Sequence, residues 1–321
     1  MTPMILLPFL SVLAAAATPA PVAVPQTAND ADALSRTDEV AIRRDDRDRM
    51  TVAVTVSGSG PYRFLVDTGA ERTVISRQLA ARLKLDSGEQ TVLHSVMGPN
   101  RVQTVFIPDL KVSSESMSVV DAPALEAANI GADGMLGIDS LRSQRVTFDF
   151  KAKTMAITSA LERQGREDGD VVVVRAKSRK GRLIFTDAVV DGVKVNVVVD
   201  TGSQVTIGNQ SLEEALVKRR HLPLTEPIEV ESVTGERMGA HVATLQRVEV
   251  GGIHIDGLAI AFADAHIFHQ LKLADEPTIL LGMNAMRAFD RITIDFAARK
   301  VRFKLPGTSM RDGYRLALLS R

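Results

Sequence analysis

Two aspartates in matching surroundings are the residues of this chain best suited to chemistry. Asp67 begins the stretch Asp-Thr-Gly-Ala, and Asp200 begins the stretch Asp-Thr-Gly-Ser. Each follows an apolar run, so each aspartate is predicted to stand at the end of a buried strand. Two carboxyl groups brought to about 3 Å cannot both ionise, so they share one proton and titrate as a pair. We therefore interpret them as an acid–base pair that meets across a pseudo-twofold axis and activates one water molecule between its two members.

The surroundings of the two aspartates repeat at an offset of 133 residues. Helix-capping residues follow at Ser76 and Asn209, and each cap is followed by two leucines four residues apart, as on one face of a helix. A glycine-containing hairpin tip and an apolar-apolar-Gly segment before a short helix also occur in both halves. Because an internal repeat outranks local signals in setting the fold, we predict two related lobes.

This pattern resembles the aspartic peptidases over residues 50–305. The lobes are short and lack the long insertions of pepsin-like lobes, so the chain is most similar to bacterial retropepsin-like units fused in tandem. The resemblance implies an all-β fold with short helices, in which two homologous acid-protease (retropepsin-like barrel) lobes enclose one cleft. It also implies an aspartic endopeptidase that hydrolyses peptide bonds of an extended polypeptide with a water activated by Asp67 and Asp200.

The resemblance assigns supporting roles to the residues that follow the two aspartates. The threonines would exchange hydrogen bonds across the axis, and the glycines would let backbone N–H groups approach the carboxylates. The active-site support is therefore expected at Thr68, Gly69, Ala70, Thr201, Gly202 and Ser203. Gly98 and Gly235 would lie in flaps that close over the substrate, although two ordinary hairpins are the alternative. Gly137 and Gly282 are expected to be scaffold.

One difference between the two motifs suggests which aspartate carries the proton. Ala70 ends the first motif, whereas Ser203 ends the second and has a hydroxyl that can donate to a carboxylate. On this basis we predict that Asp200 ionises more readily and that Asp67 holds the shared proton.

Other chemical candidates are weaker. His266 and His269 are three residues apart and would suit a metal if helical, but a surface or packed pair is the simpler interpretation. The basic run 177–182 is interpreted as a solvated hairpin turn. We expect no metal ion and no organic cofactor.

Composition excludes several other classes of function. The 321 residues contain 39 Lys and Arg against 39 Asp and Glu, so the formal net charge is zero and nothing favours a nucleic acid partner. There is no Cys, which excludes disulfides, thiolate metal sites and a Cys nucleophile.

The predicted order of segments is a signal peptide at 1–24, a linker at 25–39, lobe 1 at 40–160, a linker at 161–170, lobe 2 at 171–306 and a tail at 307–321. The first segment is an apolar run followed by small residues, although no Lys or Arg precedes it. We therefore expect an exported protein, periplasmic or secreted, with no integral membrane span after removal of the signal.

Two alternatives to a single-chain protease remain open at this point. One is a non-catalytic peptide-binding protein on the same scaffold. The other is a protease that is active only as an intermolecular dimer, with each lobe paired to its counterpart in a second chain. Because one chain carries both aspartates, we expect a monomer with an internal pseudo-dimer.

Overall fold

The computed structural model describes residues 39–41, 43–44, 50–95, 98–112, 115–161, 170–219, 227–231, 235, 237–307 and 315–317. These residues belong to one compact unit, and both predicted lobes lie within it. The predicted signal peptide, and most of the two predicted linkers and of the predicted tail, lie outside the described residues.

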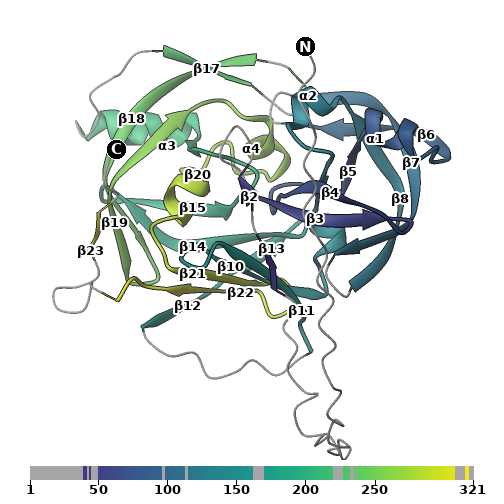
Figure 1. The fold of residues 1–321 in the computed structure, drawn as a ribbon. Helices are drawn as coiled ribbons and strands as arrows, with labels where there is room; N and C mark the ends of the chain where they lie inside the picture. The colour runs from purple at the N-terminus through teal and green to yellow at the C-terminus, as the bar shows by residue number, and fades with distance from the viewer. Residues whose placement is uncertain are drawn as a thin grey trace, which may run out of the picture. The chain divides into compact units, whose positions relative to one another are not determined.

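Lobe 1 is built around a sheet that curls into a ring (Figure 1). Its strand order is β2-β3-β4-β9-β5-β8-β7-β6, and an additional pairing of β3 with β7 closes the ring. The strands are β2 (Arg43–Arg44), β3 (Met50–Val56), β4 (Ser59–Val66), β5 (Val74–Ser76), β6 (Ser87–His94), β7 (Pro99–Val112), β8 (Glu115–Leu125) and β9 (Gly134–Leu136). Alternate residues along β3 are buried, as its β-branched sequence predicts. The last three residues of β4 are all buried.

Lobe 2 repeats this plan. Its strand order is β13-β14-β15-β20-β16-β19-β18-β17, and β14 also pairs with β18. The strands are β13 (Lys177–Arg179), β14 (Arg182–Val190), β15 (Val193–Val199), β16 (Thr206–Gly208), β17 (Pro227–Glu231), β18 (Arg237–Val250), β19 (Ile253–Phe262) and β20 (Thr278–Leu281). Within the predicted tail, β23 (Arg315–Ala317) adds to β19 in parallel. The predicted mostly-β fold of two related lobes is confirmed.

Short helices occupy equivalent places in the two lobes. They are α1 (Arg77–Arg82), α2 (Ala127–Ile130) and the 3-10 helix η1 (Ile138–Ser140) in lobe 1, and α3 (Gln210–Lys218), α4 (His266–Gln270) and α5 (Met283–Met286) in lobe 2. The predicted caps are confirmed, because the Ser76 hydroxyl accepts from the Leu79 N–H and the Asn209 side chain accepts from the Leu212 N–H.

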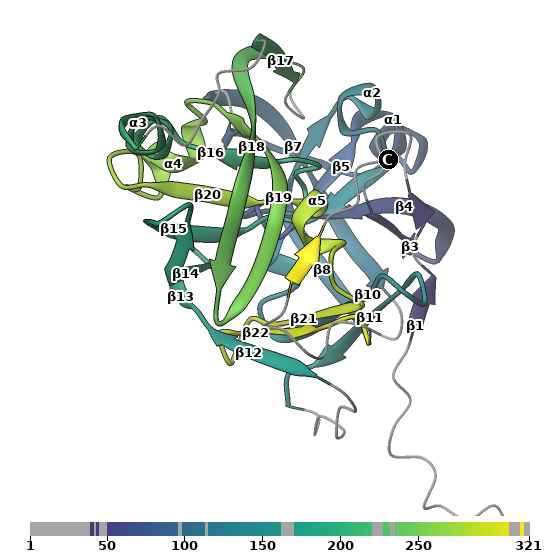
Figure 2. The ribbon, with the colours of Figure 1, turned by 90° about the vertical axis from the view of Figure 1, so that its left-hand side faces the viewer.

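A third sheet joins the lobes and lies below the two rings in Figures 1 and 2. Its order is β1-β11-β10-β21-β22-β12, so that both lobes contribute strands. The strands are β1 (Glu39–Ala41), β10 (Gln144–Asp149), β11 (Thr154–Ser159), β12 (Val171–Arg175), β21 (Arg291–Asp295) and β22 (Lys300–Lys304). β10 pairs with β21, so the two lobes share this sheet within one chain.

The centre of this joining sheet shows the pseudo-twofold symmetry in its side chains. Thr147 and Thr293 face each other, with their hydroxyl oxygens 3.1 Å apart. On one side of them Arg145 pairs with Asp295 at 3.3 Å, and on the other Arg291 pairs with Asp149 at 2.6 Å. The first pair is nearly inaccessible to solvent, so these reciprocal ion pairs fix the register of the two lobes.

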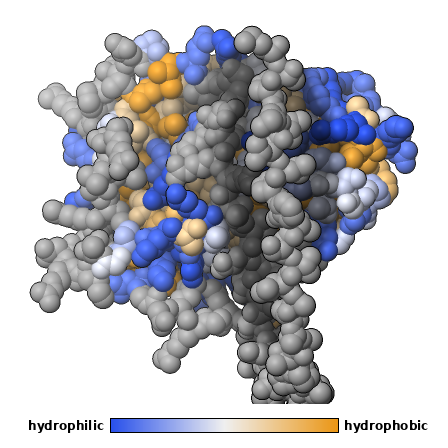
Figure 3. All heavy atoms as spheres, viewed as in Figure 1, coloured by the Kyte–Doolittle hydropathy of each residue, from blue (hydrophilic) through white to orange (hydrophobic). Residues whose placement is uncertain are grey.

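In the part of the chain that the structure describes, no helix is both long and apolar enough to cross a membrane. On the face drawn in Figure 3, hydrophilic residues surround several small hydrophobic patches.

Candidate active site

The two Asp-Thr-Gly stretches stand at equivalent strand ends. Asp67 directly follows β4, which runs parallel to β9, and Asp200 directly follows β15, which runs parallel to β20. The backbone N–H of Asp67 donates to the Leu136 carbonyl at 3.0 Å, and that of Asp200 donates to the Leu281 carbonyl at 3.1 Å. The parallel neighbours therefore fix where both aspartates leave their strands.

Two buried threonines tie these loops together across the axis. The N–H of Thr68 donates to the Thr201 hydroxyl at 3.0 Å, and the N–H of Thr201 donates to the Thr68 hydroxyl at 3.1 Å. Each hydroxyl in turn donates to a carbonyl of the other lobe, Thr68 to Val199 at 3.0 Å and Thr201 to Val66 at 2.7 Å. This is the exchange that the family resemblance implied.

The glycines of the motifs bring each loop against the opposite carboxyl group. A Cβ placed on Gly69 would lie 2.6 Å from Oδ1 of Asp200, and one on Gly202 would lie 2.3 Å from Cγ of Asp67. Each glycine also donates its N–H to the aspartate of its own lobe, at 2.7 Å in lobe 1 and 2.9 Å in lobe 2. The two carboxyl groups thus face each other and are close enough to share a hydrogen bond.

The surroundings of this pair favour one shared proton. Burial, followed by the negative charge of Asp67, raises the pKa of Asp200 to about 7. Burial also raises the pKa of Asp67, but the N–H groups of Gly69 and Ala70 oppose that rise by donating to its carboxylate. Asp200 accepts from the N–H of Gly202 alone among the described backbone contacts. Asp67 is therefore the better-stabilised anion, and Asp200 is the member that keeps the proton.

This assignment corrects the prediction made from Ser203. The Ser203 hydroxyl donates to the backbone carbonyl of Val205 at 2.7 Å and not to a carboxylate. The sequence shows that a hydroxyl is present, but it does not show that a carbonyl two residues further on takes the hydrogen bond. The backbone N–H groups of lobe 1 decide the asymmetry instead.

Arg182, at the start of β14, adds a positive charge that the sequence analysis placed in a solvated turn. Its side chain is only 5% exposed, and it crosses from lobe 2 into the active-site loop of lobe 1. Its guanidinium donates to the Gly69 carbonyl at 2.7 Å and to Glu71 Oε1 at 2.8 Å. The charge of Arg182 lowers the pKa of both aspartates. The residue 133 positions after Glu71 is Gln204, so the second loop lacks the matching carboxylate.

Two glycines shape the scaffold behind the aspartates, as predicted. A Cβ on Gly137 would lie 2.4 Å from the backbone of Arg72, and one on Gly282 would lie 2.6 Å from the backbone of Val205. Only glycine leaves room for the chain that follows each Asp-Thr-Gly stretch to pass so closely.

The two predicted flap glycines lie at the tips of hairpins, each with a positive φ that favours glycine: 143° at Gly98 and 86° at Gly235. In lobe 2, a Cβ on Gly235 would lie 2.8 Å from the Asn129 side chain of α2, so this tip reaches lobe 1. Figure 1 shows β17 extending from lobe 2 toward α2. The neighbouring residues Ser232, Val233 and Thr234, which the repeat also placed in this tip, lie outside the described residues.

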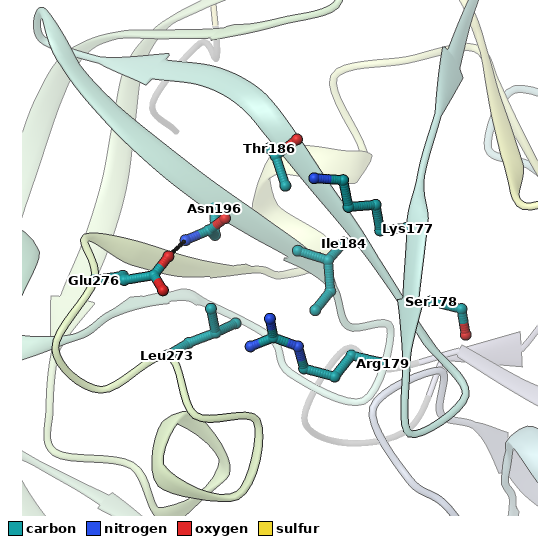
Figure 4. Close-up of a pocket in the computed structure, with 8 residues that line it drawn as sticks. All are labelled: Lys177, Ser178, Arg179, Ile184, Thr186, Asn196, Leu273 and Glu276. Carbon is teal, nitrogen blue, oxygen red and sulfur yellow. Dashed lines mark hydrogen bonds between the residues drawn. The ribbon is translucent and has the colours of Figure 1, made fainter.

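The remaining candidates lie apart from the paired aspartates. A cavity of about 270 Å³ is lined by residues of lobe 2, and none of them belongs to an Asp-Thr-Gly stretch (Figure 4). The lining residues are Lys177, Ser178, Arg179, Ile184, Thr186, Asn196, Leu273 and Glu276. His269 pairs with Asp264 at 2.6 Å, and His266 contacts His94. Over the described ranges no group of three or more His, Cys, Asp or Glu residues is placed to hold a metal ion.

Two ring-like lobes with paired Asp-Thr-Gly loops define a tandem protein of the retropepsin-like class. The family model described as "Aspartyl protease" matches residues 52–140 and 186–285, one segment in each lobe and more than half of the chain in all. The chain belongs to the aspartyl protease family. A comparison with curated proteins gave no match.

Proposed function

We propose that this chain is an aspartic endopeptidase that uses Asp67 and Asp200 as one catalytic dyad. The observation that carries the proposal is the mutual approach of the two loops, in which each motif glycine contacts the opposite carboxyl group. Family membership supports peptidase activity and a polypeptide substrate. Because both aspartates come from one chain, we propose a monomer, which analytical ultracentrifugation would test.

In the proposed reaction the Asp67 carboxylate removes a proton from a water molecule, and the water oxygen attacks the scissile carbonyl carbon. The protonated Asp200 donates a hydrogen bond to the carbonyl oxygen, which becomes a hydroxyl of the tetrahedral diol. The proton taken up by Asp67 then passes to the leaving nitrogen as the C–N bond breaks, and one hydroxyl of the diol returns its proton to Asp200 as it becomes the carbonyl of the new carboxyl group. No bond between protein and substrate forms.

The test is cleavage of a denatured protein mixture by the purified full chain between pH 3 and 8. Wild type, Asp67→Asn and Asp200→Asn are compared, with a statine-type inhibitor as control. We expect loss of activity in both variants and inhibition of the wild type. Activity that survives either substitution would contradict the shared dyad. A wild type that binds extended peptides without cleaving them at any pH would support the binding-protein alternative.

Export of the chain and the limits of its lobes are also part of this proposal. The apolar start of the sequence supports removal of residues 1–24 and a periplasmic or secreted location. N-terminal sequencing of the protein recovered outside the cytoplasm tests both points. Limited proteolysis tests the lobes, because cleavage between 161 and 170 should leave two fragments that remain associated through β10 and β21.

A further inference from the structure

A pair of histidines connects the flap of lobe 1 to lobe 2. His94 is the last residue of β6, next to the flap tip at Gly98, and His266 is the first residue of α4. Nδ1 of His94 lies 3.2 Å from Nε2 of His266, although the residues are 172 positions apart in the sequence. The ring planes differ by 11°, but the ring centroids are 5.4 Å apart. The rings therefore meet through their nitrogen edges, as in an imidazole N–H···N hydrogen bond, and not face to face.

The contact lies at the tip end of an edge strand. β6 is the edge strand of the lobe 1 sheet, and its only sheet neighbour among the described strands is β7. Its residues are exposed or half-buried, and Leu93 packs against a small core cluster of lobe 1. A hydrogen bond near the tip thus has a large influence on where the flap rests.

The receiving helix is held much more firmly. Phe268 of α4 is fully buried in lobe 2. Arg179 donates to the carbonyls of Leu271 and Lys272, just beyond the end of α4. In Figure 4 its guanidinium points from β13 toward Leu273, which follows this turn. The edge strand of the flap is therefore the side of the contact that we expect to move.

An N–H···N bond between two imidazoles needs one nitrogen with a free lone pair. It survives when both rings are neutral or when one carries a proton, but it fails when both are protonated, since neither nitrogen can then accept. The charged and titratable groups that face His266 are His94 on β6, His269 and Asp264 on and before α4, and Lys180 in the turn after β13. All of these except Asp264 disfavour a positive charge on His266.

We propose that the His94–His266 contact is a proton-operated latch, which holds the lobe 1 flap against lobe 2 at neutral pH and releases it when both rings are protonated. Burial and the neighbouring cations hold the pKa of His266 below its usual range in the closed state. The open state therefore binds protons more readily, and closure is favoured as the pH rises and lost as it falls through this lowered pKa. The ratio of closed to open molecules changes by at most about tenfold per pH unit for each proton taken up.

The latch would have a direct consequence for substrate entry, and only this consequence rests on the proposed function. A flap that closes over the paired aspartates would have to open before an extended polypeptide could reach them. At acid pH the open flap would then admit substrate. The dyad holds its shared proton in the same range of pH.

The test measures the position of the flap and not the activity. The chain contains no Cys, so spin labels can be attached at Val92→Cys on β6 and Val217→Cys on α3, where the native side chains are 49% and 46% exposed. Both aspartates of the dyad are replaced by Asn, which removes self-cleavage and the titration of the dyad. Label-to-label distances are measured by electron–electron double resonance from pH 8 to pH 4.5, and circular dichroism checks that the fold is kept.

We expect one narrow distance distribution at pH 8 and a change to longer, broader distances with a midpoint below the ordinary histidine pKa of about 6.5. His94→Ala should give the broad distribution at every pH. His94→Gln should keep a narrow distribution in acid, because its amide oxygen can accept from the protonated ring of His266 and the amide itself gains no charge. A distribution independent of pH in the parent, or an acid transition that persists in both variants, would overturn the latch. Because no step requires catalysis, failure of the proposed protease activity would leave this result intact.

Discussion

Replacement of Arg182 by Gln should change both the stability of the chain and the titration of the aspartates. The guanidinium makes two short hydrogen bonds, which contribute different amounts to the free energy of unfolding. The bond to the Gly69 carbonyl comes from a buried charged donor and is worth about 1.5–3 kcal/mol. The Glu71 carboxylate is 43% exposed and can be rehydrated, so its ion pair adds only about 0–1 kcal/mol. The free energy of unfolding should therefore fall by about 2–4 kcal/mol, measured by urea denaturation at pH 5.

The same substitution removes a positive charge that stabilises both carboxylates. Arg182 lowers the pKa of Asp67 and of Asp200, so both values should rise in the variant. In the proposed mechanism the active form of the dyad carries one proton, and its acid and alkaline limits are the two pKa values of the pair. The whole bell-shaped profile of kcat/KM should therefore move to higher pH, including the alkaline limb that begins near the Asp200 pKa of about 7.

Glu71→Gln is the matched control for this charge effect. It removes the carboxylate that faces Arg182 and leaves the guanidinium beside the dyad with less opposing charge, so the profile should move to lower pH. Carbon-13 NMR of the aspartate carboxyl groups gives the same two titrations without an assay of cleavage. A profile of Arg182→Gln that stays in place or moves to lower pH, with the fold intact, would refute this electrostatic reasoning.

Three further substitutions test other contacts. Gly202→Ala would place a methyl group 2.3 Å from Cγ of Asp67 and should lower kcat/KM by roughly 100-fold or more. In the control Gly239→Ala the added methyl group meets nothing within 4 Å, so cleavage should be unchanged. Equal effects of the two substitutions on kcat/KM would argue against the close approach of Gly202 to Asp67. Asp295→Asn removes the carboxylate from the buried pair with Arg145 and should cost about 3–5 kcal/mol of unfolding free energy in urea titrations, whereas a loss below about 1 kcal/mol, as expected of a surface pair, would show that the pair is not buried. Ser203→Ala should leave the acid limb of the pH–rate profile in place, because its hydroxyl donates to a carbonyl; a shifted limb would restore the interpretation based on sequence alone.

The features that sequence predicted well are those encoded locally and then repeated. A cap such as Ser76 depends on a backbone N–H three residues away, and its counterpart Asn209 occurs at the same offset as the aspartates. The exchange between Thr68 and Thr201 spans 133 positions, yet it follows from placing two Asp-Thr-Gly loops on one axis. Repetition thus converts a local pattern into a long-range contact that can be predicted.

Contacts that break the symmetry of the repeat were not predictable in this way. Arg182 lies in a basic run whose composition favours an exposed turn, and its partner Glu71 is 111 positions away. Its sequence counterpart Arg49 lies outside the described residues. The contact between His94 and His266 has no signal in either flanking sequence, because it depends on how far one lobe's hairpin reaches over the other. In each case the relative placement of the two lobes decides whether the contact forms.

The strands of the joining sheet are synthesised at different times, and this has a consequence for folding during translation. β10 and β11 are complete long before β21 has been synthesised, and during that interval one edge of β10 lacks the strand that carries Asp295 and Arg291. Exposed strand edges of this kind readily pair with other chains. A nascent first lobe is thus able to capture the first lobe of a neighbouring chain until its own second lobe arrives. The fused chain keeps that second lobe tethered nearby, and the tether gives the correct partner a concentration advantage over every other copy.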